Sequence, residues 1–190
     1  MNNIFLTGEK GVGKSTIINR FAKTLDFLPT GFQTLMCYKD ECGPYTLVIR
    51  PYKVDLEYVK GSKPEGDDYS IVAFRETQEI FMKVNKDAFD FAGVRILRKS
   101  LENEQARLII MDELGFMEKD AIMFQAEVFK CLDSEIPVLG VLRAGSIPFL
   151  DAISEREDVL VLEVTDKNRD QLFSDMATTK KYAQLAQCWK

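Results

Sequence analysis

The stretch that decides the fold is a glycine-rich loop at residues 8–15, which reads Gly8-Glu9-Lys10-Gly11-Val12-Gly13-Lys14-Ser15. It is a complete G-x-x-x-x-G-K-S motif, which is typical of phosphate-binding loops. Its glycines let the backbone turn tightly and approach phosphate oxygens, so that the loop N–H groups form a cradle for an anion. In this motif the lysine, Lys14, reaches the β- and γ-phosphates, and the Ser15 hydroxyl binds Mg²⁺. We therefore predict that all eight loop residues and Thr16 bind a nucleoside triphosphate, and that Lys14 is also catalytic.

The patterns on either side place this loop between a strand and a helix. Residues 3–7 form a short apolar run of the strand type. From residue 15 to residue 25, apolar side chains recur at helical spacing. A helix that begins at the end of the loop directs the positive end of its dipole at the phosphates. A chance glycine-rich turn is the alternative, and the agreement of motif and flanks argues against it.

Composition favours one globular domain that spans residues 1–190. Hydrophobic residues make up 46% of the chain and charged residues 29%, as in proteins with a buried core. The formal net charge of −5 argues against a broad basic surface, so we expect no nucleic-acid partner. No apolar run approaches the ~18 residues that span a bilayer, and no signal peptide precedes the first strand, which predicts a cytoplasmic protein without membrane contact. The cysteines at positions 37, 42, 131 and 188 match no zinc-site spacing, and we expect reduced thiols.

An acidic pair, Asp112-Glu113, follows the unbroken apolar strand predicted at residues 107–111. Because α/β folds hold their ligands at the carboxyl ends of strands, we predict that Asp112 binds Mg²⁺ together with Ser15. The chain has no histidine, so a general base must be of another type. Glu113 is placed to take a proton from an attacking water, which favours hydrolysis and a catalytic role for this residue. The alternative is that the pair is only the polar end of a strand.

Two arginines are candidates for stabilising charge on the transferred phosphoryl group. Arg143 follows the predicted strand 137–142, whose end should lie at the same edge as Asp112, and we predict that it is catalytic. Arg169 lies at the last junction of loop and helix, near where folds of this type bind the nucleobase. Asn168, which can cap that helix, and Arg169 are predicted to bind the nucleotide. For each arginine, a solvated surface position is the alternative.

The remaining patterns predict an α/β, three-layer sandwich of the P-loop type, with a mainly parallel sheet and added antiparallel strands from about residues 33–80. Residues 28–32 interrupt the first helical pattern, and residues 60–68 read as a polar loop. Ser146 should begin one of the later helices. The expected strands beyond the first are 45–50, 70–75, 107–111, 137–142 and 159–164. The expected later helices are 85–102, 119–133 with Ile122, Ala126, Phe129 and Leu132 on its buried side, 146–156, and one that begins at Arg169.

Four segments, taken in order, resemble a family of small P-loop nucleoside-triphosphatases known as the thermophile-type or cancer-related nucleoside-triphosphatases. They are the loop at 8–15, Gly31-Phe32-Gln33-Thr34, the run from Met111 to Glu118, and Val164-Thr165-Asp166-Lys167-Asn168-Arg169-Asp170. The resemblance covers nearly the whole chain in order. It is most specific at Asp-Glu-Leu-Gly-Phe-Met-Glu, residues 112–118, and poorest over residues 40–80.

This resemblance implies Mg²⁺-dependent hydrolysis of nucleoside 5′-triphosphates such as ATP or GTP to the diphosphate and phosphate, with loose base preference. It also implies nucleotide contacts along residues 8–15 and 108–115. Two alternatives stay open: a nucleotide or small-molecule kinase on the same fold, with an acceptor pocket under residues 31–80, and a nucleotide-switched binding module with slow turnover. The sequence leaves open whether a partner supplies a catalytic arginine, and it leaves the oligomeric state open.

Overall fold

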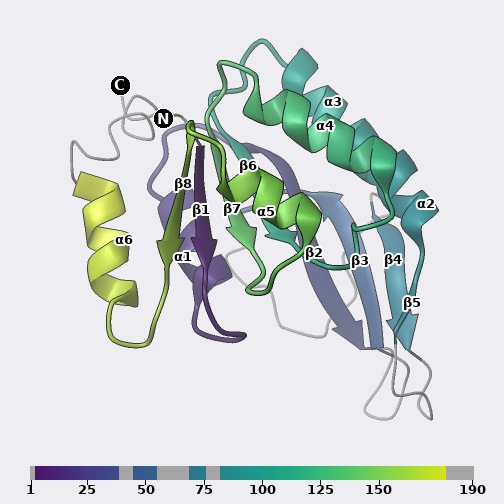
Figure 1. Ribbon diagram of the computed structural model, residues 1–190. Helices are drawn as coiled ribbons and strands as arrows, with labels where there is room; N and C mark the ends of the chain where they lie inside the picture. The colour runs from purple at the N-terminus through teal and green to yellow at the C-terminus, as the bar shows by residue number, and fades with distance from the viewer. Residues whose placement is uncertain (1–2, 39–44, 55–68, 76–81, 179–190) are drawn as a thin grey trace.

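An eight-stranded sheet in the order β5-β4-β3-β2-β6-β7-β1-β8 runs through the protein (Figure 1). The computed structural model describes residues 3–38, 45–54, 69–75 and 82–178. Neighbours among β2, β6, β7, β1 and β8 are parallel, and β3, β4 and β5 extend the sheet from β2 by antiparallel pairing. The predicted fold class, a mainly parallel sheet with antiparallel strands added at one edge, is confirmed. The strands are β1 (Asn3–Thr7), β2 (Thr30–Tyr38), β3 (Tyr45–Pro51), β4 (Ser70–Arg75), β5 (Lys83–Val84), β6 (Ile109–Leu114), β7 (Val138–Leu142) and β8 (Val159–Glu163).

Helices cover both faces of the sheet and complete the three layers (Figure 1). One face is covered by α3, α4 and α5, and the other by α1 and α6. A π-helical turn at Phe89–Gly93 joins α2 to α3 within the region predicted as one helix, 85–102. The helices are α1 (Lys14–Ala22), α2 (Lys86–Ala88), α3 (Val94–Glu102), α4 (Ile122–Leu132), α5 (Pro148–Ser154) and α6 (Arg169–Thr178).

Alternate side chains of each central strand fill two separate hydrophobic layers. On β1, Phe5 packs in the same cluster as Phe124 of α4, whereas Leu6 packs in the cluster that contains Ile18 of α1. Residues 108–111, which include the first half of β6, are fully buried, as expected of a parallel strand covered on both faces. Burial on both faces fixes the position of β1 and β6 within the sheet. The phosphate loop follows β1, and the acidic pair lies near the end of β6.

β2 was not among the expected strands, because residues 28–32 read as a break in the pattern. The strand begins at Thr30, and Gly31 pairs in parallel with Ile110 of β6. Gly31 has φ +103°, and a Cβ there would collide with the Ile110 backbone. Only glycine permits this conformation and this close approach, so the residue that reads as a breaker in the sequence lets β2 lie beside the central strand.

The predicted buried side of the 119–133 helix was partly wrong. Ile122 is 67% exposed and Ala126 is also exposed, whereas Phe124, Val128 and Cys131 are fully buried. The same segment contains two apolar rows at helical spacing, and the row through the larger Phe124 faces the sheet. Its ring packs against those of Phe32 and Phe89 at centroid distances of 5.4 Å each. Periodicity alone does not show which of the two rows is buried. The packing of this aromatic ring determines the rotation of α4 about its axis.

Smaller differences concern helix starts and the cysteines. The helix predicted at 146–156 begins at Pro148, and the Ser146 hydroxyl instead donates a hydrogen bond to the Asp151 carboxylate at 2.8 Å. Cys37 and Cys131 are buried free thiols. The predicted loop 60–68 and the other two cysteines lie outside the described residues. In the described part of the chain, every helix is too short or too polar to cross a bilayer.

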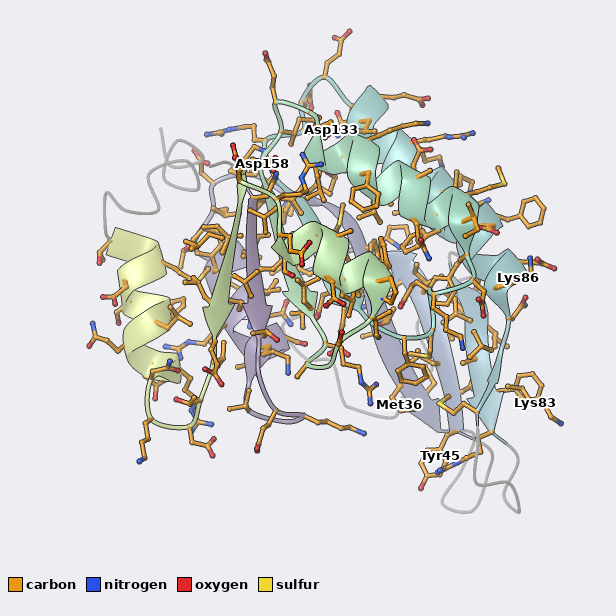
Figure 2. All side chains as sticks on the ribbon, in the orientation of Figure 1. Met36, Tyr45, Lys83, Lys86, Asp133 and Asp158 are labelled. Atoms are coloured by element: carbon orange, nitrogen blue, oxygen red, sulfur yellow. The ribbon has the colours of Figure 1, made fainter. Side chains whose placement is uncertain are left out.

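At the amino ends of the parallel strands, Arg156 ties the loops together. Its guanidinium pairs with Asp133 at 2.7 Å and with Asp158 at 2.8 Å. Figure 2 shows these two aspartates near each other at one end of the sheet and Met36 near the opposite, carboxyl end of β2. The ion-pair cluster is structural, and the candidate site lies at the other end.

Candidate functional site

Most of the predicted functional residues converge at the carboxyl ends of the parallel strands. The loop 8–13 follows β1, Asp112 and Glu113 lie near the end of β6, and Arg143 follows β7. Together they surround a cavity of about 760 Å³. The predicted residues in its wall are Gly8, Glu9, Lys10, Gly11, Gly13, Lys14, Ser15, Thr16, Asp112, Glu113 and Arg143.

The strand before the acidic pair is longer than predicted. β6 continues to Leu114, although its ladder with β7 shifts between Met111 and Leu114. Asp112 and Glu113 therefore lie where regular pairing with β7 stops, and both are only partly buried. The break in pairing leaves their side chains accessible from the cavity.

The phosphate loop is preorganised by its glycines and closed by its lysine. Gly8, Gly11 and Gly13 have φ of +133°, +86° and +106°, values that favour glycine. Lys14 is 7% exposed, and its Nζ donates to the carbonyl oxygens of Gly8 and Glu9 at 2.8 Å each. The ammonium group is thus held inside the loop, at the start of α1, where phosphate oxygens would find both a cation and the positive end of a helix.

A hydrogen bond joins the loop to the acidic pair. The Ser15 hydroxyl donates to Asp112 Oδ1 at 2.9 Å, across 97 residues of sequence. Burial raises the pKa of Asp112 to about 6; the hydrogen bond from Ser15 and the charge of Lys14 lower it, and the Glu113 charge raises it. A hydroxyl and a carboxylate side by side are hard oxygen donors, and they leave room for water and phosphate oxygens, so this pair suits Mg²⁺.

Thr34 of β2 holds the peptide that joins the two acidic residues. Its hydroxyl donates to the Asp112 carbonyl oxygen and accepts from the Glu113 N–H, each at 3.3 Å. This threonine belongs to the Gly31–Thr34 segment that carries part of the family resemblance, although the sequence analysis gave it no role at the site. Its position shows why β2 must lie directly beside β6.

Arg143 follows β7 and lines the cavity, and its side chain packs against the turn that follows β6. Its guanidinium lies over the Phe116 ring, 4.6 Å from the ring centroid. Glu118, in the same turn, is 1% exposed and accepts the Gly115 N–H at 2.8 Å. Glu118 is the last residue of the motif at residues 112–118, and no role at the site was predicted for it.

The buried Glu118 carboxyl should make the stability depend on pH. Burial is the main cause that raises its pKa from 4.5 to about 7; the Gly115 N–H lowers it, Glu113 raises it and Arg143 lowers it. As pH rises between these values, the unfolded chain releases a proton that the folded chain keeps, so the free energy of unfolding falls. We expect Glu118→Gln to lose this slope and to gain stability relative to the unmodified protein between about pH 5 and about pH 8. Denaturant unfolding at both pH values measures this, and equal pH dependence in the two proteins would contradict it.

Three predicted nucleotide contacts lie outside the cavity wall. The Val12 side chain is buried in the core cluster beneath α1. The Asn168 side chain binds the loop between β8 and α6: it accepts from the Thr165 N–H and donates to the Glu163 carbonyl oxygen, both at 2.8 Å. Arg169 lies against the phosphate loop, since a Cβ on Gly13 would be 3.8 Å from its Cδ. Asn168 and Arg169 therefore flank the loop on the α6 side.

The cavity wall also contains residues that the sequence analysis missed. Gln33, Thr34, Leu35 and Met36 come from β2, Asn19 and Arg20 come from α1, and Lys23 directly follows α1. The α1 residues follow Ser15 and Thr16 at three- and four-residue steps, so the exposed row of that helix could have indicated them. The β2 residues could not be found in this way, because the prediction began the β-rich region without placing β2 next to β6.

Comparisons with known proteins support the resemblance found in the motifs. A family model described as NTPase matches residues 69–177. Nucleoside-triphosphatase THEP1 of Thermofilum pendens is 34% identical, over 92% of this chain and 93% of that protein. THEP1 of Thermotoga maritima is 28% identical over 94% and 95%, and the cancer-related nucleoside-triphosphatase homolog of Mus musculus is 26% identical over 92% and 94%.

Solved structures agree on the fold. The crystal structure of THEP1 from the hyperthermophile Aquifex aeolicus matches with a TM-score of 0.65 and 23% identity, over 92% of this chain and 96% of that one. The solution structure of a human cancer-related nucleoside triphosphatase matches with a TM-score of 0.63 and 23% identity, over 96% and 99%. The predicted family resemblance and the predicted P-loop α/β fold are both confirmed.

Proposed function

The chain belongs to the nucleoside-triphosphatase family, and from this premise we propose how its own residues hydrolyse a nucleoside 5′-triphosphate. The oxygen of a water molecule bonds to the γ-phosphorus, and the bond from that phosphorus to the bridging oxygen breaks. The nucleoside diphosphate leaves with the bridging oxygen, and inorganic phosphate is the second product. Each group in the cavity then has one task in this displacement.

The phosphate loop binds the triphosphate in this proposal. N–H groups of residues 8–15 and the start of α1 face the β- and γ-phosphates. Lys14 exchanges its two carbonyl acceptors, those of Gly8 and Glu9, for phosphate oxygens. Because the lysine is already buried beside the loop, little conformational freedom is lost when phosphate arrives.

Ser15 and Asp112 would hold Mg²⁺. Their oxygens are already 2.9 Å apart, and carboxylate and hydroxyl oxygens are ligands that this cation prefers. When bound, Mg²⁺ supplies positive charge against the β- and γ-phosphate oxygens. Asp112 in turn has a pKa raised by burial, and a cation beside it would favour its charged form.

Glu113 acts as the general base and Arg143 as the charge stabiliser. The Glu113 carboxylate lies next to Asp112 in the cavity wall and takes the proton of the attacking water. The Arg143 guanidinium, at the rim of the same cavity, stabilises the charge that builds on the γ-phosphoryl oxygens. Glu113 lies on β6 and Arg143 directly follows β7, the neighbouring parallel strand, so both side chains come from the same edge of the sheet.

The nucleobase of the triphosphate would lie outside the cavity wall, near Asn168 and Arg169. Arg169 is 48% exposed beside the phosphate loop, and its ion pairs within the described residues are long, at 3.8 Å with Asp166 and 4.0 Å with Asp170. A planar guanidinium stacks on any base. We therefore propose broad base specificity, with ATP, GTP and pyrimidine triphosphates all accepted.

The observation that best supports this function is the Ser15–Asp112 hydrogen bond. It joins the phosphate loop, the metal-ligand candidate and, through the next residue, the general-base candidate within one cavity. A simple phosphate-binding protein needs the loop but has no need for a second carboxylate at the γ-phosphate end.

The test is Mg²⁺-dependent phosphate release from ATP, GTP, CTP and UTP. Excess EDTA should stop release from all four, and restored Mg²⁺ should return it. Similar kcat/KM values for the four nucleotides, within about 10-fold, would agree with base contacts that read only a stacking face. Release that continues in EDTA would refute the metal site at Ser15 and Asp112.

One observation favours a second candidate, phosphoryl transfer to an acceptor other than water. The cavity is lined by the phosphate loop and also by Lys23 and by Leu35 and Met36 of β2. Its volume of about 760 Å³ falls within the range of small-molecule sites. Adding a panel of nucleosides and nucleoside monophosphates to the same assay separates the two functions. A phosphorylated acceptor formed faster than free phosphate would favour the transferase.

A further inference from the structure

We propose that Glu118 is a positioning residue for Arg143, which it acts on through the turn at residues 115–118. This inference rests on the catalytic role proposed for Arg143. It adds a residue whose side chain is buried away from the reacting atoms but determines where the arginine guanidinium lies.

The turn is fixed from inside and from outside. Inside, the Glu118 carboxylate accepts the N–H of Gly115, a residue that is itself buried, at 2.8 Å. Outside, Gln125 Nε2 of α4 donates to the carbonyl oxygens of Glu118 at 2.7 Å and Lys119 at 2.9 Å. The carboxylate therefore defines the shape of the turn, and the glutamine attaches the turn to the helical layer.

Arg143 contacts this turn with its main chain, with the stem of its side chain and with its guanidinium. Its N–H donates to the Leu114 carbonyl oxygen at 2.9 Å. Its stem passes over Gly115, where an added Cβ would lie 3.4 Å from Arg143 Cδ. Its guanidinium then lies over the Phe116 ring at 4.6 Å. Main chain, stem and head thus contact three consecutive residues, which we call the arginine seat (residues 114–116).

Removing the Glu118 carboxylate would disturb the seat at its centre. The buried Gly115 N–H would lose its acceptor, and a buried unpaired donor is relieved by movement of the backbone toward another acceptor or water. The contacts of the Arg143 stem over Gly115 depend on that same backbone. Charge acts in the same direction, because Arg143 and Glu118 attract each other and Arg143 lowers the pKa of this carboxyl.

A displaced arginine would affect turnover more than binding. In the proposed site, the triphosphate is held mainly by the loop around Lys14. Arg143 interacts most strongly with the charge that develops during transfer, and its position then determines kcat. The proposal therefore predicts a change in kcat with little change in KM.

The experiment is a double-mutant cycle between Glu118→Ala and Arg143→Ala, with kcat and KM for ATP measured at saturating Mg²⁺. We expect Arg143→Ala to lower kcat by about 100-fold. Glu118→Ala should lower kcat by roughly 10-fold and change KM by less than about 2-fold, as expected of a misplaced rather than a missing group. The double variant should be no slower than Arg143→Ala alone, because both changes then act through one guanidinium.

Glu118→Gln is the matched control, since its amide oxygen can still accept the Gly115 N–H. It should recover most of the kcat lost in Glu118→Ala. The proposal is overturned if the two losses multiply in the double variant, or if Glu118→Gln is as slow as Glu118→Ala. If Glu118→Ala does not fold, Phe116→Ala replaces it in the same cycle, because this change removes part of the seat at an exposed ring. Normal kcat in Arg143→Ala would instead refute the proposed role of Arg143, which distinguishes that failure from failure of the seat.

Discussion

Lys14→Ala should lower kcat for triphosphate hydrolysis by about 10³-fold, the largest effect expected of any single change in this chain. Lys14 Nζ is held inside the phosphate loop by two carbonyl oxygens at 2.8 Å, in a position that is 7% exposed. A cation preorganised there stabilises the β- and γ-phosphate oxygens without first being ordered. Phosphate release under single-turnover conditions measures the loss directly.

The matched control is Lys10→Ala, which removes the same charge from an exposed position of the same loop. We expect it to raise KM by roughly 2- to 3-fold through weaker attraction of the triphosphate, with kcat nearly unchanged. Equal losses of kcat in the two variants would mean that Lys14 acts only through net charge. Full activity in Lys14→Ala would refute the assignment of residues 8–15 as the phosphate site.

Glu113→Gln should lower kcat by about 10²- to 10³-fold while triphosphate binding stays within about 2-fold of the unmodified protein. The amide keeps the size of the side chain but cannot accept the proton of the attacking water. The backbone of Glu113 is held by Thr34, so the substitution should leave its position unchanged. Phosphate release and the binding of a fluorescent triphosphate analogue, measured on the same samples, separate the two effects.

Asp112→Asn is the comparison that distinguishes the two neighbouring carboxylates. Because Asp112 is the proposed metal ligand, this variant should need more Mg²⁺ for half-maximal activity, whereas Glu113→Gln should need the same amount. A Glu113→Gln protein that turns over normally would exclude Glu113 as the base. It would leave the Mg²⁺ and phosphate sites as proposed.

The chemistry at the carboxyl ends of the parallel strands was predictable because motif and position agree there. Gly8 to Ser15 follows a strand and precedes a helix, and Asp112 follows the most apolar run of the chain. In a parallel sheet such residues must meet at one edge, and the structure brings them to one cavity. The same argument placed Arg143 correctly at that edge.

What local patterns could not supply was the order of the strands. Gly31 reads as a break in the sequence, and only its close contact with Ile110 across the sheet explains a glycine inside β2. Without β2 beside β6, neither the hydrogen bonds between Thr34 and the acidic pair nor the contribution of Met36 to the cavity could be anticipated. These are contacts between distant parts of the chain.

The sequence also does not show which of two similar apolar rows on a helix is buried. The helical spacing of α4 suits both the row with Ile122 and the row with Phe124, and the aromatic cluster selects the second. Glu118 is a similar case, because a charged residue in a loop is usually exposed, and only the turn back to Gly115 accounts for its burial. The rotation of α4 and the burial of Glu118 both follow from tertiary packing.

Hydrolysis in H₂¹⁸O tests the central claim most directly, namely that water attacks the γ-phosphorus of a triphosphate held by the phosphate loop. The account predicts one ¹⁸O atom in each molecule of phosphate released at single turnover and none in the nucleoside diphosphate, as read by mass spectrometry of both products. Label in the diphosphate would place the attack at the β-phosphorus. Label in neither product, with the phosphoryl group found on another molecule, would show that water is not the acceptor.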